Sequence, residues 1–168
     1  QGFDQVLLLN NDTLVDPPFL KALQACLQKS GYGVAQPLIC FAQDPETLWS
    51  AGGKWNSLLG RAITLGDRVP VSTYQPKSTE LDWATGCCML VSKAVLLQAG
   101  LLPEPYFAYF EDVDWSIRMK NQGYKLGVVP KSIIYHQSSG STKKNNTSNE
   151  GNLSPYAHYL NVRNHIYL

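Results

Sequence analysis

The stretch QVLLLNNDTLVDPPFLKALQACLQKSGYGVAQPLICF, residues 5–41, decides the fold that the sequence predicts. Residues 5–10 form a short apolar run, which is typical of a strand buried on both faces. A second run of this kind covers residues 33–41. A helical pattern separates them, and strand–helix–strand at this spacing predicts a parallel pair of strands with a right-handed crossover. The predicted fold class is therefore α/β.

The helix within this stretch has its own start and stop signals. Asp16 is a favourable N-cap, Pro17 suits a first helical turn, and Gly31 follows the expected end. One face of this helix is apolar and is expected to pack on the sheet; it comprises Phe19, Leu20, Leu23, Cys26 and Leu27.

The rest of the chain continues the same single α/β unit, without an internal repeat. The pattern first predicts short strands and turns off the main sheet (44–80), and then a strand (81–92) in whose middle Gly86 allows close backbone approach. Two helices follow: one is capped by Ser92 and ended by Gly100, and the other runs from about 112 to 122 and is stopped by Gly123. Two short strands around Pro130 (125–136) come next. Residues 137–153 are polar and predict a mobile loop, which precedes an aromatic and basic segment at 154–168.

The composition is that of one globular domain. Of the 168 residues, 44% are hydrophobic and 16% are charged, which suffices for a sizeable core. A net charge of +1 argues against a nucleic-acid binder that works by neutralising phosphates. No apolar run approaches the roughly 20 residues that span a bilayer, and no signal peptide opens the chain. Because the chain starts at Gln1 and enters a strand almost at once, we expect it to be part of something longer.

The four cysteines, Cys26, Cys40, Cys87 and Cys88, include no C-x-x-C pair. A zinc site or a disulfide framework therefore has little support. We expect buried, reduced thiols in a cytosolic protein.

Asp12, in LLLNNDT (7–13), comes just past the end of a predicted strand, where open α/β sheets bind ligands. A carboxylate there can hold Mg²⁺ or Mn²⁺, which in turn holds phosphate oxygens. The alternative is a local turn in which Asn10, Asn11 and Asp12 bond their own backbone. The residues alone favour the turn.

Glu111, Asp112 and Asp114 crowd together behind a run of aromatic residues in PYFAYFEDVDWSIRMKNQGY (105–124). They can simply cap a helix and add charge near its positive end, an environment that lowers a carboxyl pKa. Mutual repulsion and loss of water would instead raise the pKa toward the range of a general base. In isolation, these residues favour capping.

Three further sites have two interpretations each. His136 ends an apolar strand, where it is either structural or a metal ligand. Lys143 and Lys144 are either solvated charges or cations that close over a diphosphate. Trp83 suits the core better than a sugar-stacking platform.

Taken in this order, the segments resemble the GT-A-fold glycosyltransferases of family 2, close to the rhamnosyltransferase-like members, over nearly the whole chain. VLLLNNDTLVDPPFL resembles the metal-binding stretch, with Asn10, Asn11 and Asp12 at an Asp-x-Asp-like triplet. The most specific part runs from WATGCCMLVS to IIYHQSSGS and resembles the path from the acceptor-side strand, through a Glu-Asp motif, to a strand-end His. SAGGKWNSLLGR resembles a mid-domain glycine segment, and YLNVRNHIYL resembles the family's Tyr…Arg-Asn segment.

The resemblance implies an inverting, metal-dependent transfer of a sugar from a nucleoside-diphosphate-sugar, UDP- or dTDP-linked, to a saccharide or lipid-linked acceptor. Asp112 would be the general base, with Glu111 as its partner in the motif. Asp12 and His136 would hold Mn²⁺ or Mg²⁺ against the donor diphosphate. The remaining substrate-binding residues that it implies are Trp83, Thr85, Gly86, Asn10 and Asn11. We also expect a cytoplasmic protein, with peripheral association at the inner face of the membrane and a homodimer as further expectations.

One departure from the family concerns the start of the chain. Members carry strand–helix units that bind the nucleotide base before the metal motif, whereas this chain begins just before that motif. We therefore expect residues 1–168 to be one incomplete domain: the C-terminal part of a GT-A sheet, with flanking helices, a small accessory β region and an exposed sheet edge. The alternatives are a non-catalytic carbohydrate- or partner-binding remnant, a metal-dependent phosphohydrolase using Asp12, Asp112 and His136, and a purely structural role.

Overall fold

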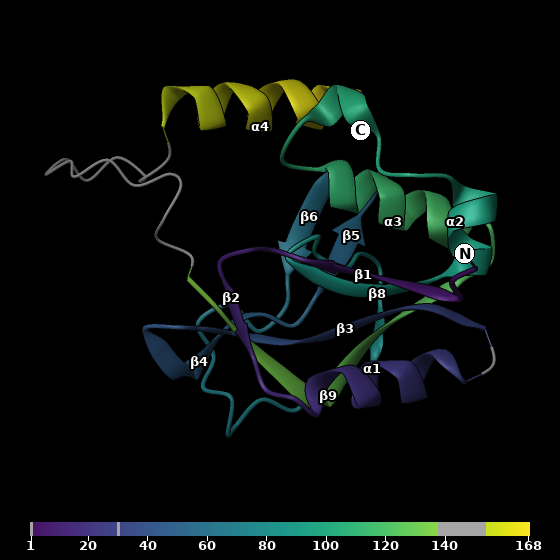
Figure 1. Cartoon of the computed structure of the whole chain (residues 1–168). Coiled ribbons are helices and arrows are strands. Elements are labelled where there is room, and N and C mark those ends of the chain that lie inside the picture. The colour runs from purple at the N-terminus through teal and green to yellow at the C-terminus, as the bar shows by residue number, and fades with distance from the viewer. Residues whose placement is uncertain (1, 30, 138–153) are drawn as a thin grey trace, which may run out of the picture.

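The computed structural model describes residues 2–29, 31–137 and 154–168, and it shows a mixed sheet with helices on both faces (Figure 1). The main sheet has the order β1-β8-β3-β9-β2, while β4 pairs with β3 and β7 pairs with β9. Its strands are β1 (Gln5–Leu9), β2 (Thr13–Val15), β3 (Tyr32–Phe41), β4 (Asp44–Ser50), β7 (Glu80–Leu81), β8 (Cys88–Ser92) and β9 (Lys125–His136). A separate two-stranded sheet consists of β5 (Gly53–Asn56) and β6 (Arg61–Thr64). The helices are α1 (Phe19–Leu27), α2 (Lys93–Ala99), the 3₁₀ turn η1 (Glu104–Tyr106), α3 (Glu111–Asn121) and α4 (Pro155–Tyr167).

Strand β3 lies in the middle of the core and is buried on both faces, as its apolar run predicts. Its side chains alternate between two clusters. Ala35 and Ile39 join the cluster on the α1 side of the sheet, which includes Leu23 of α1. Val34 and Leu38 join the cluster on the opposite side, where α2 and α3 pack. The period of two residues in a strand thus divides the core between the two faces.

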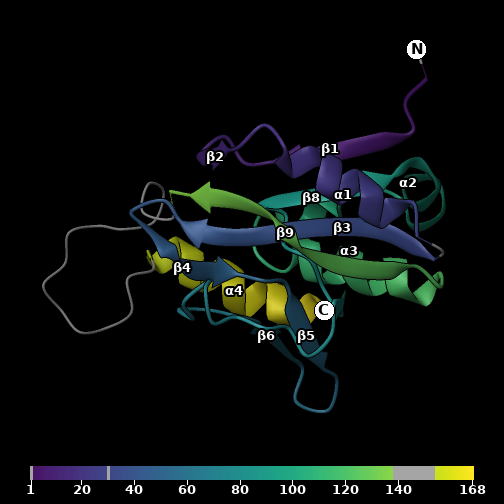
Figure 2. The ribbon, with the colours of Figure 1, turned by 90° about the horizontal axis from the view of Figure 1, so that it is seen from below.

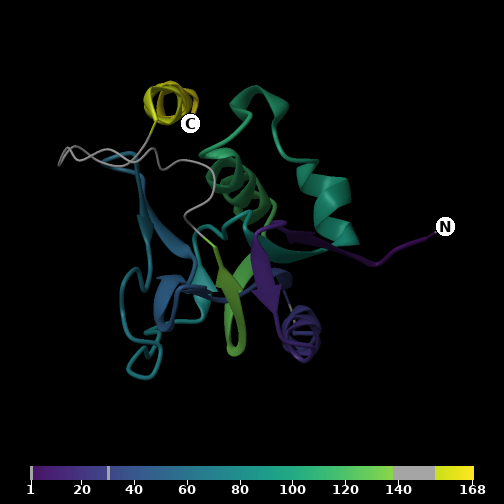
Figure 3. The same ribbon diagram turned by 60° about the vertical axis from the view of Figure 1, so that its left-hand side comes forward.

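The helices are distributed accordingly. Helix α1 covers one face and α2 and α3 cover the other, as the views in Figures 1 and 2 agree. The predicted apolar face of α1 is confirmed, since Phe19, Leu23 and Cys26 are buried and Leu20 and Leu27 are partly buried against the same cluster. Helix α4 lies on the α3 side of the sheet (Figures 1 and 3).

The predicted pairing of the first two apolar runs is wrong. Strands β1 and β3 run in the same direction, but β8 lies between them and is antiparallel to both. Periodicity indicates that a strand is buried without specifying its neighbour. As the terminal strand of the described sheet, β1 is only half-buried rather than buried on both faces.

The start of α1 also differs from the prediction. The N-cap position is Pro18, not Asp16, and no side chain caps this helix. Pro18 has no N–H, which removes one of the amides that a capping carboxylate at Asp16 would bind. The preceding residues, expected to be only a polar loop, form β2, whose Thr13 pairs with His136 of β9.

Three further strand predictions need correction. β4 joins the main sheet instead of lying off it. The strand predicted for residues 81–92 is divided into β7 and β8 by a turn. The two strands predicted around Pro130 form one strand, β9, whose pairing with β3 jumps from Val129 to Ile133 through an irregularity. The jump accommodates Pro130, which has no N–H for a regular ladder.

Other predictions are confirmed. Ser92 caps α2 by accepting from the Val95 N–H, and Gly100 and Gly123 follow α2 and α3 with positive φ. All four cysteines are buried and free. Within the described ranges, no helix is long and apolar enough to cross a membrane. The predicted loop and its Lys143 and Lys144 lie almost entirely at positions 138–153, outside the described residues.

Candidate active site

Residues 84–87 form the turn that leads into β8. Each of their four consecutive backbone N–H groups donates a hydrogen bond to a side-chain oxygen. The bonds are Ala84 N–H to Ser116 Oγ (3.1 Å), Thr85 N–H to Gln36 Oε1 (2.7 Å), Gly86 N–H to Asp112 Oδ2 (3.0 Å) and Cys87 N–H to Thr85 Oγ1 (3.3 Å). Gln36 of β3 and Ser116 of α3 are fully buried. A buried N–H group left without a partner costs about 1–3 kcal/mol. These bonds therefore fix the turn against α3, and with it the position of Asp112.

Asp112 is in the first turn of α3, yet it does not cap the helix. The N-cap position belongs to Phe110, which has left-handed backbone geometry and no side-chain cap. Asp112 Oδ1 accepts from the Val113 N–H at 2.9 Å, and Oδ2 accepts from Gly86. Burial raises the pKa of Asp112, while these two N–H groups and the Thr85 hydroxyl act in the opposite direction. The capping interpretation is thus wrong for Asp112.

Glu111 differs from its neighbour in having a carboxyl oxygen without a partner. Its Oε2 is buried and accepts no hydrogen bond from the described residues. Burial is the larger cause, and repulsion from Asp112 the smaller, of a rise in the pKa of Glu111 from 4.5 to about 7. The adjacent carboxyls therefore meet different environments, and near neutral pH Glu111 is partly protonated.

Asp12 and His136 lie side by side because β2 pairs with the end of β9. The Gln137 N–H donates to the Asp12 carbonyl at 2.9 Å, and Asp12 Oδ1 lies 3.3 Å from His136 Nε2. Asp12 Oδ1 is buried and has no hydrogen bond of acceptable geometry among the described residues, as is also true of His136 Nδ1. The Trp49 ring packs edge-on against the imidazole, with 4.5 Å between centroids. Asp12 Oδ1 and His136 Nε2 therefore lie next to each other without forming a well-aligned hydrogen bond.

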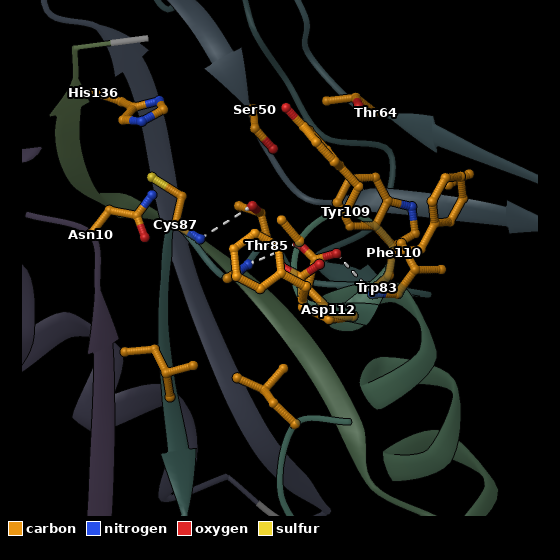
Figure 4. Close-up of a pocket in the computed structure, with 18 of the residues that line it drawn as sticks. Asn10, Ser50, Thr64, Trp83, Thr85, Cys87, Tyr109, Phe110, Asp112 and His136 are labelled. Carbon is orange, nitrogen blue, oxygen red and sulfur yellow. Dashed lines mark hydrogen bonds between the residues drawn. The ribbon is translucent and has the colours of Figure 1, made fainter. Parts of the chain in front are cut away.

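These groups share one cleft of about 1190 Å³. His136 lies at one end of it, near Cys87 and Asn10, and Asp112 lies farther along it, next to Thr85 and Trp83 (Figure 4). The rings of Trp83, Tyr109 and Phe110 surround the Asp112 end in the same view. The cleft thus has the Asp12 carboxylate beside the His136 imidazole on one side and a buried carboxyl among aromatic rings on the other.

A sequence model of the family described as "Glycosyltransferase like family 2" matches residues 2–150. The chain belongs to this family. The match covers all of the elements that line the cleft except α4, which contributes Asn161.

Two curated relatives are similar to this family 2 chain. An N-acetylglucosaminyl-diphospho-decaprenol L-rhamnosyltransferase of Mycobacterium tuberculosis is 28% identical over 158 residues, which cover 86% of this chain and 50% of the relative. The low-salt glycan biosynthesis hexosyltransferase Agl10 of Haloferax volcanii is 27% identical over 124 residues, covering 74% of this chain and 39% of the relative. The chain spans about half or less of the length of these relatives.

A solved structure shows the same fold. The crystal structure of GalNAc-T7 with UDP, GalNAc and Mn²⁺ superposes with a TM-score of 0.56 at 17% sequence identity, covering 79% of this chain and 27% of the other. Together with the family match, this confirms the predicted GT-A α/β fold with flanking helices.

The structure brings most of the predicted site residues of this family 2 chain together. The cleft is lined by Asn10, Asp12, Trp83, Thr85, Gly86, Glu111, Asp112 and His136. Asn11 is exposed and does not line it. The roles assigned to these residues remain predictions.

Gly86 has a different structural role from the one predicted, whereas the prediction that Trp83 belongs to the core is confirmed. A Cβ at Gly86 would lie 3.8 Å from the Asp112 Cβ, in ordinary contact, so the glycine is not required for close packing there. Close packing is required at Gly53 instead, where a Cβ would lie 1.9 Å from the Trp83 ring. Trp83 is only 8% exposed, so its ring belongs to the core as well as to the cleft wall.

Sequence reasoning missed several cleft residues. They include Trp49, Ser50, Thr64, Asp67, Cys87, Phe107, Tyr109, Phe110 and Asn161. The aromatic run directly before Glu111 was a usable signal for Phe107, Tyr109 and Phe110. The others come from β4, β6, α4 and neighbouring loops, whose approach to α3 is a tertiary property without a local sequence pattern.

Proposed function

We propose that the intact protein transfers a sugar from a nucleoside-diphosphate-sugar, UDP- or dTDP-linked, to a hydroxyl group of a saccharide or lipid-linked acceptor, with inversion at the anomeric carbon. The observation that carries the proposal is that one cleft holds the Asp12–His136 pair and the Glu111–Asp112 pair, contributed by segments far apart in a family 2 chain. The two ends of the cleft suit the two ends of this reaction, the departing diphosphate and the attacking hydroxyl.

Asp112 is the proposed general base. Each of its carboxyl oxygens accepts one N–H bond, which holds the group in place and leaves lone pairs free for a substrate hydroxyl. Burial raises its pKa toward a range in which it can accept a proton. As the acceptor oxygen attacks the anomeric carbon, its proton passes to Asp112 and the bond to the diphosphate breaks. A single displacement of this kind inverts the configuration.

Glu111 is the proposed partner of Asp112. Because the Glu111 carboxyl is partly protonated at neutral pH, it does not place a full negative charge beside Asp112.

Asp12 and His136 fit a divalent cation. Adjacent ligands around a small six-coordinate cation lie about 3 Å apart, close to the 3.3 Å between Asp12 Oδ1 and His136 Nε2. The imidazole favours Mn²⁺ over Mg²⁺, since Mg²⁺ prefers oxygen ligands. When bound, such a cation neutralises charge on the leaving diphosphate. No larger cluster of His, Cys, Asp and Glu side chains occurs among the residues described, so diphosphate oxygens and water would complete the coordination.

The acceptor and location belong to the same proposal. The mycobacterial relative is named for a decaprenol-linked acceptor, which supports a lipid-linked acceptor here. A cytoplasmic reaction at the inner face of the membrane is a further part of the proposal. Peripheral membrane association, a homodimer and the incomplete-domain interpretation of residues 1–168 remain predictions.

The deciding experiment compares Asp112→Asn with wild type in the intact protein, measuring transfer from UDP- and dTDP-sugars. Loss of a general base predicts a fall in kcat of about 10²-fold or more. Calorimetric binding of Mn²⁺ and UDP or dTDP should survive in this variant and be lost in Asp12→Ala and His136→Ala. Asp16→Asn, an exposed carboxyl next to α1, is the control. Normal transfer by Asp112→Asn would contradict the assignment. Sugar binding without turnover in wild type would favour the non-catalytic alternative.

A further inference from the structure

The loop that delivers Glu111 and Asp112 to the cleft has strained backbone geometry. Three of its non-glycine residues have positive φ: Phe107 (62°), Tyr109 (67°) and Phe110 (67°). Bulky side chains rarely adopt this region; each such residue costs of order 1–3 kcal/mol and persists only where its surroundings impose the conformation. Something outside the loop must therefore hold it in this form.

The loop also determines where α3 begins. Helix α3 has no side-chain N-cap, and its first helical bond runs from the Asp114 N–H to the carbonyl of Phe110 (2.9 Å). The left-handed geometry of Phe110 thus sets the direction in which the chain enters α3. Any contact that fixes residues 106–110 therefore also fixes the direction in which the side chains of Glu111 and Asp112 project from the first turn of α3.

Asn164 of α4 makes that contact from more than fifty residues away. Its side chain is fully buried, and its Nδ2 donates to the carbonyls of Tyr106 (2.9 Å), Ala108 (2.6 Å) and Tyr109 (2.8 Å). Three carbonyls share two N–H groups, so at least one bond is divided between acceptors. No other side chain in the described ranges binds as many of this loop's carbonyls.

Arg163 orients the Asn164 amide and binds the start of the loop. Arg163 Nε donates to Asn164 Oδ1 at 2.8 Å, which assigns the oxygen and directs the NH₂ group at the loop. Its Nη2 donates to the carbonyls of Pro105 (2.9 Å) and Tyr106 (2.8 Å). The next residue, His165, stacks on Phe110 with 5.3 Å between ring centroids and 4° between planes. Three consecutive residues of α4 thus contact the loop at its start, middle and end.

We propose that Asn164, oriented by Arg163, is a positioning residue: it holds the strained 106–110 loop and thereby directs Glu111 and Asp112 into the cleft. Helix α4 would then be an integral part of the site. The effect on catalysis rests on the proposed function, whereas the effect on the loop and on the Gly86–Asp112 bond does not.

The first test measures hydrogen exchange of single amides by NMR and needs no activity. Asn164→Ala should accelerate exchange of the Ala108 amide, which lies in the loop, and of the Gly86 amide, which Asp112 holds across the cleft. Asn164→Asp keeps the size but loses the donors and should behave like Asn164→Ala, whereas Asn164→Gln keeps the donors and should recover part of the protection. Asn121→Ala, an exposed asparagine at the end of α3, is the matched control and should change neither amide.

The second test measures kcat and KM in the intact protein. Misplacement of a base by about 1 Å can cost 10²-fold, so we expect a kcat loss on the order of 10- to 100-fold in Asn164→Ala, with the donor KM little changed. Unchanged exchange at Gly86, or a kcat no lower than that of Asn121→Ala, would overturn the proposal. If wild type transfers no sugar, the proposed function fails, but the exchange of Ala108 and Gly86 still decides whether Asn164 positions the pair.

Discussion

The stability of the Glu111→Gln variant, compared with that of wild type, should increase as the pH rises. Burial and the neighbouring Asp112 raise the pKa of Glu111 from 4.5 to about 7. The folded chain therefore binds this proton more tightly than the unfolded chain does. Between these two values the folded state holds more protons, so ionisation of Glu111 makes stability fall as pH rises, and the loss levels off above about pH 7. Glutamine cannot ionise and removes this loss.

The size of the effect follows from the same two values. A rise from 4.5 to about 7 corresponds to roughly 3 kcal/mol, at about 1.4 kcal/mol for each pH unit. Glutamine leaves an NH₂ group where Oε2 has no partner among the described residues, which costs some stability at every pH. That cost is the same at pH 5 and pH 9, so only the difference between the two pH values measures the carboxyl.

The assay is urea denaturation of wild type and Glu111→Gln from pH 5 to pH 9. The free energy of unfolding of the variant, minus that of wild type, should increase by roughly 2.5 kcal/mol over this range, most of it below about pH 8. Glu46→Gln, an exposed glutamate after the start of β4, should show no such trend. Parallel curves for wild type and Glu111→Gln would refute the reasoning, because they would mean that Glu111 has an ordinary pKa in the folded protein.

Two further substitutions test the walls of the cleft. Gly53→Ala should displace the Trp83 ring, since the new Cβ would lie 1.9 Å from it; we expect a loss of about 1–3 kcal/mol by urea denaturation and a shift in tryptophan fluorescence. Gly2→Ala, which has open space around it, is the control, and equal stability of the two variants would contradict the packing. Gln36→Leu should leave the Thr85 N–H unpaired and cost about 1–3 kcal/mol, with faster exchange of the Thr85 amide as the specific readout. Unchanged exchange at Thr85 would show that another group holds this turn.

Local features were predictable because their causes are local. The burial of β3 on both faces follows from its continuous apolar run, and the apolar face of Phe19, Leu23 and Cys26 on α1 follows from the helical period; both predictions are confirmed. The Ser92 cap and the positive φ of Gly100 depend on residues within one helical turn. The family motifs likewise indicated the groups at Asp12, Asp112 and His136 that the cleft brings together.

Interactions between distant segments were not predictable in this way. The sequence shows that β1, β3 and β8 are apolar strands, but not that β8 separates the other two, because an apolar run packs equally well beside several partners. Asp112 appeared to be a capping residue because caps are judged from neighbouring residues. One of its two N–H partners is the adjacent Val113, but the other, the Gly86 N–H, is 26 residues away.

The sequence by itself therefore determined most of the helices and strands, although not β2, together with the apolar faces of several of them and the side chains to which we propose to assign the chemistry. The tertiary structure alone decided the order of the strands, the approach of Asp12 to His136, and the hold of Asn164 on the loop before Glu111. The physical reason is range. Periodicity and capping act over a few residues, whereas a strand's neighbour and a buried amide's acceptors are selected by total burial and hydrogen bonding across the whole fold.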